Sequence, residues 1–202
     1  MKKLAFAGGI ALAFLLAGCS ETPTEKKAEK PPEPVTGRYA LYEMYRPARL
    51  WAADVEILTL RSINIPEVPS APGKAGAWQA TFISPSKGKA RDWTYSTAAS
   101  TGNLRKGPFA GLEESWSGPR GVNQPFNIIA LHTDTDEVFK VAESKAKDYE
   151  KKNPGKPVIF VLEKTNRHPD PTWRVVWGES VGSSDFSILV DASTGLYAET
   201  VR

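Results

Sequence analysis

The 202-residue chain has one cysteine and two histidines, and this scarcity excludes several kinds of chemistry. A single cysteine cannot form an internal disulfide, a thiol redox pair or a cysteine-rich zinc site. The charge is also nearly balanced, with 26 Lys and Arg against 23 Asp and Glu. Because nucleic-acid-binding domains concentrate basic residues on one surface, we expect no nucleic-acid partner. With 41% hydrophobic residues the chain can still bury a core, in one domain or two small ones.

Long hydrophobic runs are scarce as well, and the clearest one lies at the N-terminus. Two lysines precede an uncharged stretch from Leu4 to Leu16, and small residues and Cys19 follow it. This order is the three-part plan of a secretory signal. The stretch is too short for a permanent membrane-spanning helix, which needs about 20 apolar residues.

Leu16-Ala17-Gly18-Cys19 resembles the lipobox of bacterial lipoprotein signals. The resemblance implies that residues 1–18 are a cleaved signal peptide. It also implies that Cys19 receives a diacylglyceryl group and an acyl chain such as palmitate, which anchor the protein in a lipid bilayer. An ordinary signal peptide with an incidental cysteine is the alternative. By the same resemblance, Ser20 after the cysteine favours the outer membrane, facing the periplasm, over the inner membrane.

The segment after the cysteine is rich in Pro, Glu and Lys and has no large apolar residue. Such a segment cannot bury enough surface to become ordered, so we expect residues 19–34 to be a lipidated, disordered tether. An arm that folds onto the domain is the alternative. Since proline-rich segments extend by up to about 3.1 Å per residue, the tether would hold the folded part away from the membrane.

The remaining sequence contains signs of an internal repeat. When Asp92 is aligned with Asp185, the tetrapeptide Ala-Ser-Thr-Gly coincides at residues 99–102 and 192–195. Upstream of the aligned aspartates, each copy has a tryptophan that opens an alternating apolar run. The distance from tryptophan to aspartate differs by two residues between the copies, which we attribute to a hairpin loop of variable length.

These tryptophans are Trp78 and Trp173, and they suggest the domain boundaries. We predict two tandem units, at residues 35–106 and 127–202. Between them, residues 107–126 contain several Gly and Pro, and we interpret them as a connecting segment whose Trp116 packs onto the sheet.

The second unit has the clearer signals of secondary structure. Asp134 followed by Glu137 is a capping pattern, and apolar residues then recur at helical spacing until Asn153-Pro154-Gly155. Strand-like runs follow at residues 157–164, 172–178, 185–191 and 196–201. The sequence therefore predicts an α+β fold in which each unit is a helix followed by an antiparallel β-meander, with the sheets packed on the helices.

In the first unit the helix is less clear. Residues 37–45 and 48–54 both have helical character, and Pro47 is expected to break or kink the helix between them. An apolar run at residues 55–65 then predicts the first strand.

The second unit resembles a PepSY-type domain, an extracytoplasmic module of a helix and an antiparallel sheet. The resemblance covers about residues 135–202 and rests on the helix with Tyr149, the strand Trp173-Arg174-Val175-Val176, and the segment Val190-Asp191-Ala192-Ser193-Thr194-Gly195. The first unit departs from it, because Ala98 replaces the aspartate. A pair of such units is also similar to the β-lactamase inhibitory protein architecture. These resemblances imply binding or inhibition of a partner rather than catalysis.

The histidines do not predict an active site. His132 is followed by Asp134 and Asp136, but these residues also suit a helix cap, and no third or fourth metal ligand is evident. His168 and Asp170 could form part of a catalytic triad, but the chain has no G-x-S-x-G nucleophile elbow, and it also lacks a phosphate loop. We therefore expect no enzymatic activity, no metal and no cofactor.

Alternation along the strands assigns two faces to the sheet of the second unit. The face under the helix would carry Val158, Phe160, Leu162, Trp173, Val175, Trp177, Phe186, Ile188 and Val190. The opposite face would be too apolar to contact water, so either the same chain or a partner must cover it. Our candidate partner-binding residues are Ile159, Val161, Arg174, Val176, Ser187 and Leu189.

We therefore expect a membrane-anchored extracytoplasmic binding module that engages or inhibits an envelope protein or peptide, for example a peptidase. A structural envelope lipoprotein without a specific ligand is the alternative. A small hydrolase that uses His132 or His168 is a third hypothesis. The sequence indicates neither the identity of the partner nor the oligomeric state.

Overall fold

The computed structural model describes residues 30–100, 104–119 and 121–202. Its helices are α1 (Gly37–Trp51), the short 3-10 helix η1 (Ile128–Ala130) and α2 (Thr135–Lys152). The strands of its large sheet are β2 (Glu56–Ile63), β4 (Ala77–Ser84), β5 (Lys89–Ser96), β6 (Gly107–Ser115), β7 (Val158–Thr165), β8 (His168–Trp177), β9 (Ser187–Asp191) and β10 (Tyr197–Val201). A separate pair joins β1 (Val35–Thr36) to β3 (Lys74–Ala75).

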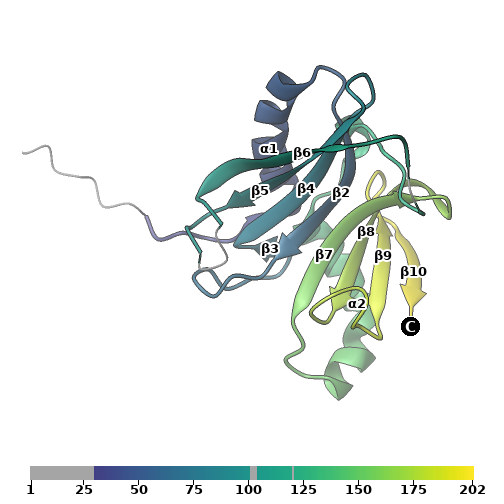
Figure 1. Cartoon of the computed structure of the whole chain (residues 1–202). Coiled ribbons are helices and arrows are strands. Elements are labelled where there is room, and N and C mark those ends of the chain that lie inside the picture. The colour runs from purple at the N-terminus through teal and green to yellow at the C-terminus, as the bar shows by residue number, and fades with distance from the viewer. Residues whose placement is uncertain (1–29, 101–103, 120) are drawn as a thin grey trace, which may run out of the picture. The chain divides into compact units, whose positions relative to one another are not determined.

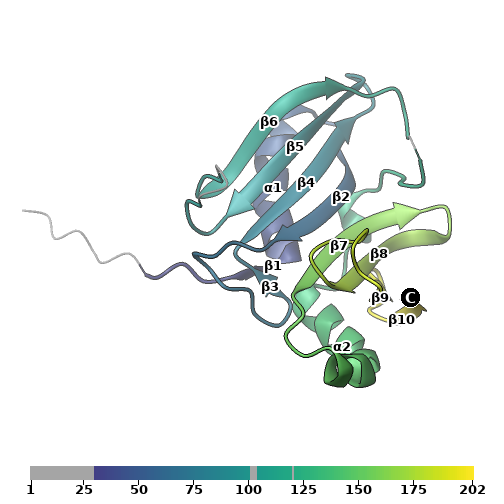
Figure 2. The same cartoon turned by 60° about the horizontal axis from the view of Figure 1, so that its bottom comes forward.

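The eight strands form one continuous antiparallel sheet in the order β10-β9-β8-β7-β2-β4-β5-β6 (Figure 1). Both α-helices lie on the same side of this sheet (Figures 1 and 2). An α+β fold with a large antiparallel sheet is thus confirmed. The two central strands, β2 and β7, pair through Thr59, Leu60 and Arg61, which face Glu163, Leu162 and Val161 respectively.

Helix α2 begins and ends where the sequence predicts. Asp134 is its N-cap, and the side chain accepts a hydrogen bond from the Thr135 amide. Asp136 and Glu137 lie in the first turn and Lys151 and Lys152 in the last, as the helix dipole favours. Asn153 is the C-cap.

Helix α1 differs from the prediction because Pro47 lies inside one continuous helix. A proline there removes one main-chain hydrogen bond and crowds the preceding turn. Met44 lies three residues before the proline and Ala48 directly after it, and both are fully buried against the sheet. Burial of this apolar face keeps the two helical segments aligned in spite of the proline.

The connecting segment is shorter than predicted, because Gly107–Ser115 forms β6 at the edge of the sheet. Edge strands tolerate proline and glycine, because on one side of the strand there is no neighbouring strand with which the backbone must form hydrogen bonds. Pro108 is therefore compatible with pairing to β5, and so is the shift in register between Arg91 and Trp93. The Gly- and Pro-rich composition that suggested a linker therefore belongs to an edge strand. The connection between the two halves begins near Trp116.

At the start of β8 the structure also corrects the prediction. The predicted strand begins at residue 172, but His168-Pro169-Asp170-Pro171 is already part of β8, and His168 pairs with Thr165 of β7.

The core lies between the helices and the sheet, and the predicted inner face of the second half is confirmed. Val158 is partly buried, and the other eight predicted residues are buried in one cluster with residues of both helices. This cluster also contains Trp78, Trp93 and Phe82 from the first half of the chain. The two halves therefore share a single hydrophobic core.

Two tryptophans tie this core to the starts of the helices. The Trp78 indole N–H donates to the Val35 carbonyl, and that of Trp173 donates to the Thr133 carbonyl, each at 3.1 Å. Val35 and Thr133 both stand directly before the N-cap of a helix. The two indole rings meet edge to face, with centroids 6.5 Å apart.

The same junction joins the N-termini of both α-helices. Asp134 accepts hydrogen bonds from the amides of Thr135 and Arg38, and the Thr135 hydroxyl oxygen accepts one from the Gly37 amide. A side chain at Gly37 would come within 2.7 Å of the Trp173 ring and 3.0 Å of the Trp78 ring. Only glycine therefore fits between the tryptophans.

The observed strand register shows that the predicted difference in length between the halves does not lie in the hairpin loop. Trp78 pairs with Tyr95 in β4–β5, and Trp173 pairs with Val190 in β8–β9, so the two hairpins have equal length. Asp92 consequently corresponds to Ser187 and not to Asp185. The additional residues of the first half lie after β5, and Gly102, predicted to match Gly195, is outside the described residues.

Replacing Gly195 by valine should destabilise the protein by more than about 1 kcal/mol, because a β-branched residue is strained at positive φ. Gly195 has a φ of 74°, and an added Cβ would lie 3.2 Å from the Thr133 hydroxyl. Gly182→Val is the matched control, since a Cβ at Gly182 would meet nothing within 4 Å. Denaturant unfolding measures both variants, and equal midpoints would contradict the assigned turn conformation.

Asp54 should make stability depend on pH in the acid range. Its carboxylate accepts hydrogen bonds from the Ser84 hydroxyl and the Ser86 amide, which lower its pKa from 3.8 to about 2. A carboxyl group whose pKa is depressed in the folded state stabilises the fold above its unfolded pKa, and this effect disappears as the pH falls towards the folded pKa. The stability difference between the unmodified protein and Asp54→Asn should therefore shrink from about pH 5 to about pH 2. Denaturation at several pH values tests this, and a constant difference would refute it.

Candidate functional site

The side of the sheet without helices contains a hollow of about 630 Å³ at the centre of the molecule. We call it the central hollow. Its floor is formed where β2 and β7 pair, and its walls come from three loops. The floor consists of Thr59, Arg61, Ile63, Ile159, Val161 and Glu163, and the walls include Asn64, Asn123, Glu179, Ser180, Val181 and Gly182.

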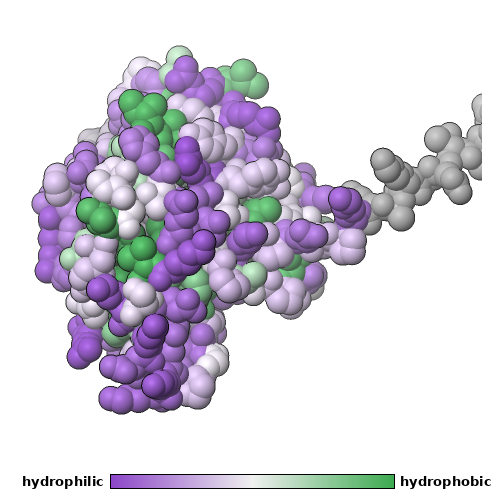
Figure 3. Space-filling view, turned by 180° about the vertical axis from the view of Figure 1, so that it is seen from behind, coloured by the Kyte–Doolittle hydropathy of each residue, from purple (hydrophilic) through white to green (hydrophobic). Residues whose placement is uncertain are grey.

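The walls exist because the chain folds loops over part of the helix-free face. Ile65 and Val68 of the loop after β2 form a second small apolar cluster with Ala77. The connection between the halves crosses the end of β7, where Asn123 pairs with Thr165. These segments, together with the loop after β8, surround the central hollow. On the opposite, helix-bearing side hydrophilic residues predominate, and hydrophobic residues form separate patches (Figure 3).

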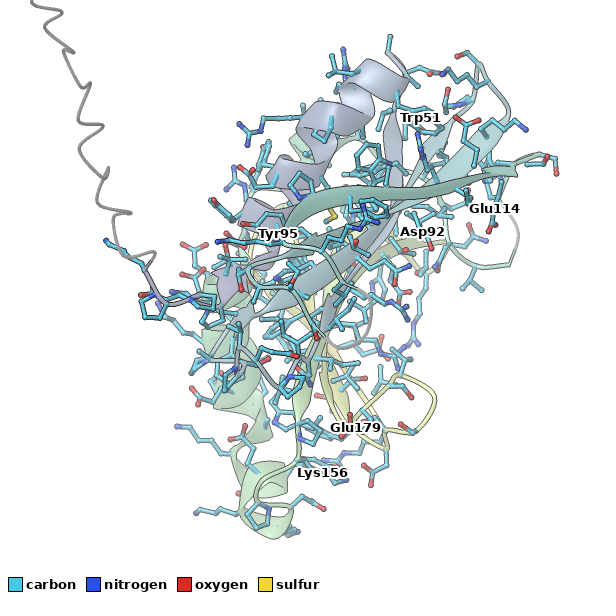
Figure 4. The ribbon with its side chains drawn as sticks, turned by 60° about the vertical axis from the view of Figure 1, so that its left-hand side comes forward. Trp51, Asp92, Tyr95, Glu114, Lys156 and Glu179 are labelled. Carbon is cyan, nitrogen blue, oxygen red and sulfur yellow. The ribbon has the colours of Figure 1, made fainter. Side chains whose placement is uncertain are left out.

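Arg61 begins a polar network that runs across three strands on the helix-free face. Its guanidinium donates to the Gln79 side-chain oxygen through Nε and Nη2, at 3.0 and 2.5 Å. The Gln79 amide donates to Asp92 at 2.7 Å, and the Thr81 hydroxyl donates to the same carboxylate at 2.6 Å. Asp92 and Glu114 lie on the side of the sheet away from α1 (Figure 4). The network holds the exposed Arg61 in place at the edge of the hollow.

Two carboxylates of the central hollow have no hydrogen bond or ion pair with any described residue. Glu163 comes from the floor, and Glu179 comes from the loop after β8 (Figure 4). Among the described residues, the hollow therefore offers one guanidinium, two carboxylates without a partner, and the apolar side chains of Ile63, Ile159 and Val161. This combination suits an extended peptide with alternating polar and apolar side chains.

The predicted partner-binding residues fall into two groups. Ile159 and Val161 line the central hollow, and Arg174 lines a neighbouring pocket. Leu189 lines the same neighbouring pocket and is 8% exposed. Val176 and Ser187 are only 0% and 2% exposed, so the chain itself covers them and they are not available to a partner. Substituting Val176 would consequently report on folding rather than on binding.

Sequence reasoning missed Arg61, Gln79 and Asp92. Given the observed register, these three residues occupy the positions in the first half that Val161, Arg174 and Ser187 occupy in the second. The matched tryptophans already make Gln79 the counterpart of Arg174, and the strand pairing makes Arg61 the counterpart of Val161. Only Asp92 was displaced, because the shared Ala-Ser-Thr-Gly tetrapeptide aligned it with Asp185, two residues before Ser187.

The structure separates the histidines from the groups with which the sequence associated them. His132 is exposed, and its carbonyl accepts a hydrogen bond from Arg38. His168 Nε2 lies 3.6 Å from a Glu199 carboxylate oxygen, and Asp170 is exposed. Within residues 30–100, 104–119 and 121–202, no group of three or more His, Cys, Asp and Glu is arranged to hold a metal ion. Cys19, the predicted lipidation site, lies outside the described residues.

Comparisons with known proteins give one structural similarity. No family model matches the chain, and no curated protein matches it in sequence. The fold is similar to the crystal structure of a "putative lipoprotein" from Clostridium difficile 630, with 7% sequence identity and a TM-score of 0.45 over 80% of this chain and 91% of that one. The resemblance to PepSY-type domains therefore rests on the sequence motifs alone. None of the helices in the described part of the chain is long and apolar enough to cross a membrane.

Proposed function

We propose that this chain is a lipid-anchored protein of the bacterial envelope, and that it binds a protein or peptide there without catalysing a reaction. The signal-like residues 1–18, the lipobox-like tetrapeptide and the proline-rich tether support the anchor. Ser20 favours the outer membrane, with the folded part in the periplasm.

The central hollow is the observation that carries the binding proposal. Glu163 is partly buried and has no partner among the described residues, which costs free energy in the isolated protein because its carboxylate is partly removed from water without compensation. A bound segment with a basic side chain near Glu163 and Glu179, and an acceptor near Arg61, would supply the missing interactions. The occupant we favour is an exposed, extended segment of an envelope protein, such as a peptidase that the chain would inhibit.

We further propose that the two halves arose by duplication of one unit. Three correspondences support this: the order of helix and four strands, the equal hairpins, and the two indole hydrogen bonds to residues before the helix N-caps. The arrangement is compatible with PepSY-like repeats and with the paired architecture of the β-lactamase inhibitory protein. In such an arrangement the pairing of β2 with β7 creates the hollow, so a single unit would lack it.

Replacing Cys19 by alanine should remove the protein from the membrane fraction, because the chain has no other thiol to accept the lipid. Mass spectrometry of the mature N-terminus should find an acylated Cys19 in the unmodified protein. A purified protein that still carries an unmodified peptide spanning residues 1–18 would contradict the proposed anchor.

A photo-crosslinking amino acid at Val181, on the wall of the central hollow, should capture a discrete partner in intact cells. The same group at Lys140, exposed on α2, is the positional control and should not capture it. Arg61→Glu should abolish the crosslink from position 181, because it replaces the only cation among the described residues that line the hollow with a third negative charge.

Arg49→Glu makes the same charge change on the exposed end of α1 and should leave the crosslink intact. Circular dichroism and membrane fractionation confirm that each variant is folded and anchored. If position 181 gives no crosslink, or gives the same one as position 140, the alternative of a structural envelope lipoprotein replaces the binding proposal.

A further inference from the structure

A second pocket lies beside the central hollow, at the corner formed by the ends of β7, β8, β9 and β10. We call it the corner pocket. Its volume is about 390 Å³, within the range of small-molecule sites in proteins. The residues that matter for its chemistry are Val122, Glu163, His168, Arg174, Leu189 and Val201.

Two cations, Arg167 and Arg174, line the corner pocket, and the one without a carboxylate partner among the described residues is Arg174. It is partly buried, and its Nε donates to the Ser187 hydroxyl at 3.0 Å. No carboxylate of a described residue lies within ion-pairing distance of it, whereas the neighbouring Arg167 pairs with Glu199 at 2.7 Å. A partly buried guanidinium without a counter-ion is costly, and its remaining N–H groups are suited to hold a carboxylate by two hydrogen bonds.

His168 adds a second polar atom without a partner. Its Nε2 is buried and makes no hydrogen bond, because the Glu199 oxygen is 3.6 Å away. Buried polar atoms are nearly always hydrogen-bonded in folded proteins. A ligand oxygen in the corner pocket could accept a hydrogen bond from this nitrogen when the proton is on Nε2.

Three apolar residues also line the pocket, beside the polar residues Thr165, Asn166, Arg167 and Thr172. Leu189 is 8% exposed at the base, Val201 of the last strand is partly buried, and Val122 is 64% exposed at the mouth. Pockets that combine apolar walls with a few convergent polar groups bind amphipathic ligands, because the polar groups fix the orientation and the walls bury the remainder.

We propose that the corner pocket binds a carboxylate carried on an apolar chain. The carboxylate would lie on the free N–H groups of Arg174, near His168, and the apolar chain would contact Val122, Leu189 and Val201. Fatty acids and the C-terminal residue of a peptide both have this chemistry. The proposal does not depend on partner binding at the central hollow, because its ligand and its cationic residue are different.

The charge of Glu163 predicts in which direction its substitution should change ligand affinity. Its carboxylate lines both cavities and has no partner among the described residues, so it would repel an anion bound beside Arg174. Removing its charge should therefore strengthen the binding of a carboxylate and weaken the binding of a cation.

The test uses the lipidated full-length mature protein in phosphatidylcholine vesicles, with protein-free vesicles as the blank. Octanoate and octanol are titrated calorimetrically as a charged and an uncharged ligand of similar length. N-acetyl-leucyl-leucine and its C-terminal amide form the corresponding peptide pair. The variants are Arg174→Gln, Glu163→Gln and the surface control Arg49→Gln.

We expect the carboxylate of at least one pair to bind more tightly than its uncharged counterpart, and the pair that binds identifies the source of the ligand. Arg174→Gln should weaken that binding about tenfold, the scale of a charge-assisted hydrogen bond, and leave the uncharged ligand unaffected. Glu163→Gln should strengthen it, and Arg49→Gln should not change it. No binding in either pair, equal loss in the Arg49 control, or weaker binding in Glu163→Gln would overturn the proposal.

Discussion

The contact on which this fold depends is the junction of the two indoles with the start of α1. Trp78 and Trp173 each donate to the residue before a helix N-cap, and their rings pack against each other over Gly37. Asp134 caps α2 and also accepts a hydrogen bond from the first turn of α1, whose own N-cap Thr36 makes no side-chain cap. One site therefore fixes both helices relative to each other and to the sheet.

This junction explains how a short strand pairing can join the two halves. The ladder between β2 and β7 contains three residue pairs, which alone would be a weak connection between two four-stranded meanders. On the helix side of the sheet, the buried indoles and the shared core also join the two halves at the seam where β2 pairs with β7. On the other side of the seam the central hollow opens at Arg61 and Val161. The pairing of β2 with β7, which makes the sheet continuous, therefore also positions the candidate site.

The sequence was sufficient to predict elements with strong periodicity and clear end signals. Helix α2, the inner face of the second half and its strands follow from alternation and from the caps Asp134 and Asn153. The prediction failed where tertiary packing overrides local preference: α1 continues through Pro47, and β6 forms in a Gly- and Pro-rich segment. Arg61 and its network escaped notice because cross-strand partners depend on register, which periodicity does not fix, and because Asp92 was aligned with Asp185, two residues from its true counterpart Ser187.

A comparison of equivalent positions on the helix-free face shows how one frame can support two kinds of chemistry. In the first half Gln79 bridges Arg61 and Asp92, so the cation and the anion are linked through a neutral amide. In the second half the corresponding residues are Arg174, Val161 and Ser187, and the cation has only a hydroxyl as its partner. The strand registers are alike, but at these three positions the first half links its charges internally, whereas the second half leaves Arg174 without a counter-ion among the described residues. Binding chemistry on this face is therefore set by side-chain differences between the halves, and the asymmetry concentrates it around β7 and β8.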